Sequence, residues 1–94
     1  MYKIIIEDYR YGDVQEGEYN ETFDTLSAAQ AFLIEDVMNE FGNKFDRVIE
    51  DDCNTFESKE EMRETITDAI EGNDCLWINV AGDKFRYAIK KVRK

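Results

Sequence analysis

The sequence predicts an α+β fold, in which a single antiparallel sheet of about four strands carries two helices packed on one face. Segments rich in β-branched and aromatic residues lie near both ends of the chain, and two segments with the spacing of amphipathic helices lie between them. The predicted order is therefore strand, strand, helix, helix, strand, strand. Ninety-four residues are enough for one core of this kind, so we expect residues 1–94 to form a single acidic domain.

The first two strands are predicted to form an antiparallel hairpin. Residues 2–11 are dominated by β-branched and aromatic residues, and residues 18–23 alternate between two faces. Gly12 and Gly17 are expected to lie in the loop between the strands. Glu21 interrupts the apolar face of the second strand, which leaves its register open.

The first helix is predicted over residues 27–41. Ser27 and Gln30 have the spacing of a capping box, in which side chains satisfy free backbone N–H groups at the start of a helix, and Gly42 provides a stop. The apolar surface of this segment is broad, which is typical of a main core helix. Phe32 lies outside that surface, so it is either an exposed aromatic contact or covered by a neighbouring loop or strand.

The second helix is predicted to begin at Ser58, which forms a capping box with Glu61, and to end at Gly72. The positions that share its apolar stripe are Met62, Ile66, Ala69 and Ile70. Their spacing predicts that this stripe faces the core. The preceding residues 44–57 fit either a short helix or an irregular buried strand.

The last two strands are predicted over residues 75–80 and 84–92, with a turn at Gly82 between them. The last strand is basic, whereas the chain as a whole is acidic. We interpret its basic side chains as protection of a sheet edge against pairing with other chains. The alternative is a nucleic-acid contact in which Trp77 and Tyr87 stack on bases.

The charge of the chain restricts its partners. It has 22 acidic and 12 basic residues, which gives a formal net charge of −10. Because phosphate backbones and anionic membranes would be repelled, we expect no direct binding of nucleic acid or membrane, and a cationic protein is the natural complement. No apolar run approaches the roughly 18 residues of a membrane span, and the N-terminal apolar run is too short for a signal peptide. We therefore expect a cytoplasmic protein.

The residues of common catalytic sites are missing or are used elsewhere. Without histidine, neither a Ser–His or Cys–His nucleophile nor the usual zinc site can be assembled. The glycines form no phosphate-binding loop, and residues 50–54 lack the alternating order of a calcium loop. Cys53 and Cys75 are isolated, and we interpret them as buried thiols rather than as a disulfide. We therefore expect no enzyme activity, metal or cofactor.

The strongest candidate for a functional surface is an acidic array on the second helix and just before it. Together with Phe32 as an aromatic contact, its members are Glu50, Asp51, Asp52, Glu57, Glu60, Glu64, Asp68 and Glu71. Glu60 lies in the first helical turn, where the helix macrodipole favours a carboxylate. Asp68 and Glu71 lie toward the other end, where the macrodipole disfavours them, and like charges one turn apart repel. Uncompensated local costs of this kind are enriched at functional sites.

We interpret the protein as a small acidic inhibitor or binding protein that occupies the basic surface of a nuclease or other nucleic-acid-binding enzyme. An aromatic anchor such as Phe32 or Phe56 would then prolong the complex. In size, charge and lack of catalytic groups the chain resembles phage-encoded inhibitors of host defence nucleases, anti-CRISPR proteins among them, and immunity proteins that neutralise nuclease toxins. No motif carries this resemblance, so it implies a DNA-mimic type of binding and assigns no residue a role. The alternative is a structural or scaffold subunit with a solvated acidic face, which forms a homodimer through a sheet edge.

Overall fold

The computed structural model describes residues 1–51 and 54–92. In chain order its elements are β1 (Tyr2–Tyr11), β2 (Asp13–Phe23), α1 (Leu26–Phe41), the 3₁₀ helix η1 (Gly42–Arg47), β3 (Ile49–Asp51), β4 (Asn54–Thr55), α2 (Lys59–Asn73), β5 (Cys75–Val80) and β6 (Asp83–Lys91). The four long strands form an antiparallel sheet in the order β2-β1-β6-β5, and β3 pairs with β4 in a separate small hairpin. The predicted α+β fold with a four-stranded antiparallel sheet and two helices is therefore confirmed.

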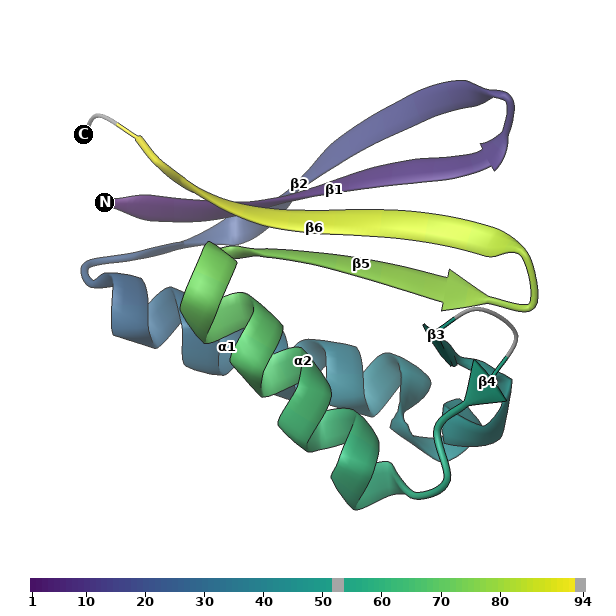
Figure 1. The fold of residues 1–94 in the computed structure, drawn as a ribbon. Coiled ribbons are helices and arrows are strands. Elements are labelled where there is room, and N and C mark those ends of the chain that lie inside the picture. The colour runs from purple at the N-terminus through teal and green to yellow at the C-terminus, as the bar shows by residue number, and fades with distance from the viewer. Residues whose placement is uncertain (52–53, 93–94) are drawn as a thin grey trace.

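Both helices lie on the same side of the sheet (Figure 1). α1 packs against β1, β2 and β6, whereas α2 packs against β5 and against α1. The largest side chains that are almost fully buried between these layers are Ile4, Leu33, Met62, Ile66, Ile70, Val37 and Val48. The other face of the sheet is open in Figure 1, with no helix across it.

The β1–β2 hairpin is tighter than the sequence predicts. β2 begins at Asp13, so Gly12 alone separates the two strands, and its φ of +85° explains why glycine is suited to this turn. Gly17, expected in the loop, lies inside β2 and pairs with Ile6. Loop glycines and strand glycines look alike in a sequence, because the difference depends on the partner strand.

A bulge in β2 explains the acidic interruption of its apolar face. Residues 19–21 of β2 lie opposite the single residue Ile4 of β1. The extra residues allow Tyr19 and Phe23 to pack against the core while Glu21 is exposed. The Glu21 carboxylate therefore remains in solvent and does not enter the core.

The helix boundaries differ from the prediction at two of the four ends. The Thr25 side chain caps α1 by accepting a hydrogen bond from the Ala28 N–H at 3.1 Å, so Ser27 is not the cap. At α2 the predicted cap is confirmed, because Ser58 Oγ accepts a hydrogen bond from the Glu61 N–H at 3.1 Å. α2 then continues past Gly72 to Asn73. Asp74 ends it with a φ of 54°, the left-handed conformation that follows many helices.

The basic strand β6 lies in the interior of the sheet, between β1 and β5, so its interpretation as a protected edge is wrong. Charged residues are tolerated there because alternate side chains of a strand point to opposite faces. Tyr87 faces the helices and is 4% exposed, whereas Arg86 and Lys90 belong to the open face. A buried Tyr87 also excludes the alternative in which it stacks on bases together with Trp77.

Residues 44–57 combine both of the forms that the sequence allowed. η1 is helical, and β3 and β4 form a short hairpin. Val48 and Phe56 anchor this segment in the core, with exposures of 1% and 5%. Because Phe56 is buried, it cannot serve as the exposed aromatic anchor that we considered.

The packing of α2 is tested by replacing Ile66, which is 1% exposed, with alanine. We expect the free energy of unfolding in urea to fall by about 2–5 kcal/mol, because the substitution leaves a cavity beneath α2. The exposed neighbour Thr65 provides the control, and Thr65→Ala should change it by less than about 1 kcal/mol. Equal effects of the two substitutions would contradict the burial of this face.

Candidate protein-binding site

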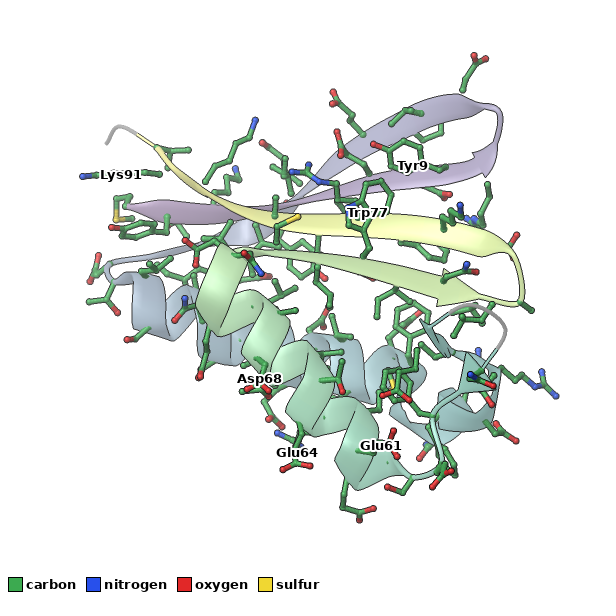
Figure 2. All side chains as sticks on the ribbon, in the orientation of Figure 1. Tyr9, Glu61, Glu64, Asp68, Trp77 and Lys91 are labelled. Carbon is green, nitrogen blue, oxygen red and sulfur yellow. The ribbon has the colours of Figure 1, made fainter. Side chains whose placement is uncertain are left out.

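Four carboxylates line the side of α2 that faces away from the core. Glu60, Glu64, Asp68 and Glu71 are all exposed, and Figure 2 shows Glu64 and Asp68 pointing away from the sheet. They recur at intervals of three or four residues, which places them in a row with about 5–6 Å between successive members. The opposite side of the same helix is held by the buried Met62, Ile66 and Ile70. The buried side of α2 therefore fixes the orientation of the helix that carries the four carboxylates.

Within residues 1–51 and 54–92, none of these four carboxylates forms an ion pair. The arginine of α2 is engaged elsewhere, since Arg63 binds both carboxylate oxygens of Glu35 on α1, at 2.6 and 3.1 Å. These hydrogen bonds lower the pKa of Glu35 and raise the pKa of Arg63. Arg63 thus joins the helices and leaves the acidic row without neutralisation.

The helix macrodipole accounts for only part of the row. Glu60 and Glu61 occupy the first turn of α2, where the N-terminal end favours negative charge. The last turn contains no basic residue, and Glu71 lies there instead. Asp68 and Glu71 therefore oppose the macrodipole, and neither has a described ion-pair partner that compensates for it.

The other acidic residues of the predicted array lie before α2. Glu57 is exposed just before the Ser58 cap, and Glu50 is exposed on β3. The backbone of Asp51 belongs to β3, and Asp52 lies outside the described residues. The structure thus places Glu57 next to the α2 row and adds a separate exposed acid on the β3–β4 hairpin.

Phe32 packs at the junction between α1 and β2 and makes no described ring contact with α2. Its ring lies 5.1 Å from that of Phe23 and 6.1 Å from that of Tyr19, between centroids. The Tyr19 hydroxyl donates a hydrogen bond to Asp36, and burial raises its pKa. Phe32 remains 36% exposed, so β2 covers it only in part.

The open face of the sheet contains an aromatic pair that the prediction of the site did not include. Trp77 is 55% exposed, and its ring lies 5.1 Å from that of Tyr9. Beside it, Arg86 donates a hydrogen bond to Glu7 at 2.8 Å, which lowers the pKa of Glu7. The alternation of β5 carries the signal for Trp77, because Leu76 and Ile78 on either side of it are buried.

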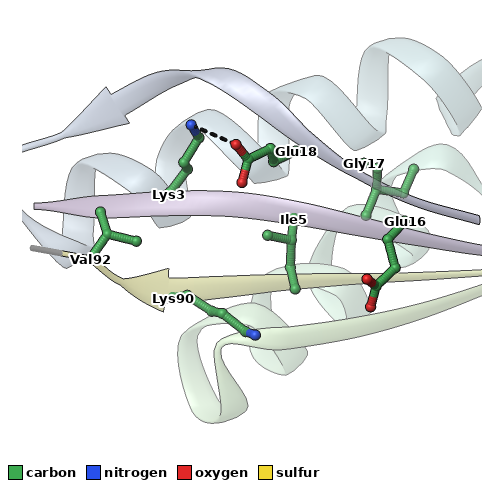
Figure 3. A pocket seen from close by; sticks show the side chains of 8 residues that line it. Lys3, Ile5, Glu16, Gly17, Glu18, Lys90 and Val92 are labelled. Carbon is green, nitrogen blue, oxygen red and sulfur yellow. Dashed lines mark ion pairs between the residues drawn. The ribbon is translucent and has the colours of Figure 1, made fainter.

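A shallow depression of about 400 Å³ lies on the same open face (Figure 3). Its charged lining residues are Lys3, Lys90, Glu16 and Glu18. Lys3 and Glu18 form an ion pair at 3.0 Å. Two bases and two acids balance one another, in contrast with the α2 row. The depression therefore does not select a ligand by charge.

Residues 1–51 and 54–92 contain no group of three or more Cys, Asp or Glu side chains arranged to hold a metal ion. No helix among them is long and apolar enough to cross a membrane. Cys75 is a free thiol that is only partly buried, contrary to the expectation, and Cys53 lies outside the described residues.

Charge reversal at the two ends of α2 tests whether the row serves stability. Glu71→Lys should raise the free energy of unfolding by about 0.3–1 kcal/mol at low salt, because a cation suits the C-terminal end. Glu60→Lys is the matched control and should lower it by a similar amount. Urea denaturation measures both. A loss of stability in Glu71→Lys would show that the native carboxylate has a structural role.

No protein-family model matches the chain, and neither the curated proteins nor the solved structures yield a match to it. No residue role can be carried over from a relative. Any function of the acidic row therefore rests on the charge, exposure and packing of its own residues.

Proposed function

We propose that the protein is a non-catalytic cytoplasmic binding protein, which inhibits a nuclease or other nucleic-acid-handling enzyme by covering its basic surface. The observation that carries the proposal is the row of exposed carboxylates on α2, which has no ion-pair partner in the described part of the chain. A groove that binds phosphates is lined by lysine and arginine, and these side chains complement such a row.

The rigidity of α2 supports binding of this kind. Because the backbone of α2 is already ordered, binding restricts only the side-chain rotamers of the carboxylates, so a larger share of the electrostatic attraction appears as affinity. Their spacing of about 5–6 Å is wider than the roughly 3.4 Å between phosphates along one DNA strand. The row alone therefore reproduces only part of a phosphate backbone, and we propose that Glu57 extends it.

Long-range attraction would also act before contact. A net charge of −10 speeds the approach of a cationic partner and slows that of nucleic acid. Once bound, the protein would block access of the substrate to the groove. Catalysis by the protein itself is not needed for inhibition.

The second candidate function is a scaffold subunit that forms a homodimer through a sheet edge. The uncharged sequence of β5, which lies at one edge of the sheet, favours this alternative. Mutual repulsion of two chains of charge −10 opposes it. The two candidates respond differently to salt, since added salt weakens attraction between opposite charges and reduces repulsion between like charges.

The proposal predicts that reversing three charges of the row removes partner binding. The wild-type protein and the triple variant Glu64→Lys, Asp68→Lys, Glu71→Lys are immobilised and exposed to a lysate of the native cells at low salt. A basic nucleic-acid-binding protein should elute from the wild-type column at high salt, and DNA should compete with its binding. The variant should retain none of it, and mass spectrometry of the eluates measures the difference.

The matched control places the same change of charge on β2 and the link that follows it, with Asp13→Lys, Glu21→Lys and Asp24→Lys. These residues are exposed and have no ion-pair partner among the described residues. The control should retain most of the partner. Equal losses in both variants would mean that only net charge matters, and retention by a folded α2 variant would remove α2 as the site.

A further inference from the structure

The two edges of the sheet differ in how they are protected. β2 has a bulge and several exposed acids, features that discourage another strand from pairing with it. β5, with the sequence CLWINV, has no charged residue and no bulge in its pairing with β6. An edge of this kind readily accepts an added strand.

The backbone of β5 presents hydrogen-bonding groups at this edge. The Ile89 N–H donates a hydrogen bond to the Asp74 carbonyl at 2.9 Å. In an antiparallel pair of strands, hydrogen-bonded and non-hydrogen-bonded residue pairs alternate, so the next pair, Cys75 and Ala88, is not hydrogen-bonded. Cys75, and Trp77 two residues later, therefore direct their own N–H and C=O groups away from β6. At the other end of β5 the edge is covered, because Val80 forms a bridge with Val48. The open part runs from Cys75 to Ile78.

The side of α2 that faces away from α1 is acidic. α2 packs beneath β5, and Arg63 marks the side of the helix that faces α1. At about 100° per residue, Glu61 and Asp68 lie roughly 140–160° around the helix from Arg63, on the side of α2 that is turned away from α1. In Figure 2 Glu61 lies near the first turn of α2, whereas Asp68 lies nearer the end at which β5 begins. A second copy paired edge to edge would bring two such helices together, and their like charges would repel.

We propose that the β5 edge binds an extended cationic segment of the partner, which adds to the sheet as a fifth strand beside Cys75 and Trp77. Alternate side chains of an added strand point to opposite faces. Lysine or arginine side chains on the helix side would meet Glu61 and Asp68, and those on the open side would pack against the exposed face of Trp77. The inference rests on the proposed function, because it specifies how a basic partner binds.

The test uses a fluorescein-labelled peptide of alternating lysine and valine, and fluorescence anisotropy measures its binding at low salt. Two further peptides are N-methylated at alternate residues, one at the lysines and one at the valines. Only one of these sets can direct its N–H groups toward β5. One methylated peptide should therefore bind about tenfold more weakly or worse, and the other should bind like the parent. Equal binding of all three peptides, or no binding of the parent, would overturn strand addition.

Protein variants separate this inference from the proposed function. Glu61→Gln with Asp68→Asn should weaken binding of the parent peptide severalfold, whereas the matched pair Glu21→Gln with Asp13→Asn on β2 should leave it within about twofold. Sensitivity to the α2 charges without sensitivity to N-methylation would overturn strand addition and leave the proposed function standing. Sensitivity to N-methylation alone would contradict the cationic preference on which both depend.

Nuclear magnetic resonance locates the bound peptide. Amide exchange at Cys75 and Trp77 should slow when the parent peptide is added, and exchange along β2 should not change. Sedimentation of the free protein identifies the competing occupant. If the free protein forms a dimer that protects the same two amides, the occupant of the β5 edge is a second copy of the chain. That result would overturn the proposal.

Discussion

The burial of one side of α2 between α1 and β5 is the constraint on which the rest of the molecule depends. Met62 and Ile70 are fully buried and Ile66 is 1% exposed, so the helix cannot rotate about its axis without exposing them. That fixed orientation turns the carboxylates outward. It also holds α2 beneath β5, at the edge of the sheet. A single packing interaction therefore determines both the presentation of the acidic row and its position beside an open strand.

The electrostatic arrangement follows from this packing. Arg63 binds Glu35 across the interface between the helices, and Arg86 binds Glu7 on the open face of the sheet. These pairs place positive charge where it links elements, whereas the outer side of α2 has none at its C-terminal end. Replacement of its carboxylates is expected to stabilise the helix where they oppose the macrodipole. A feature that does not serve folding is a reasonable place to seek function.

Sequence patterns predict the features of the fold that depend on residues close together in the chain. The Ser58 cap, the buried stripe of α2 and the four long strands each depend on residues close together in the chain. Thr25 and Ser27 are both good capping residues, and which of them caps α1 depends on where the chain leaves β2. The interior position of β6 depends on pairing with β1 at the other end of the chain. The edge position of β5 follows from the same strand order, so this edge of the molecule could not be assigned from local patterns.

The acidic row could be predicted from helical spacing, but its setting could not. The sequence suggests Phe32 as an aromatic contact of the row, whereas the structure places its ring against β2. The sequence allows Phe56 equally well as an anchor, but its side chain is buried. In both cases the neighbours of an aromatic side chain come from distant segments, and a sequence pattern does not contain them.

The most direct test of the central claim is the salt dependence of the dissociation constant for the captured partner, measured with the wild-type protein and with Glu64→Gln. If the α2 row binds a cationic surface, log Kd rises linearly with log salt concentration, and the slope is smaller for the variant because one charge is missing. If the two slopes are the same, Glu64 does not contribute to electrostatic binding. A Kd that does not change with salt would contradict the account as a whole.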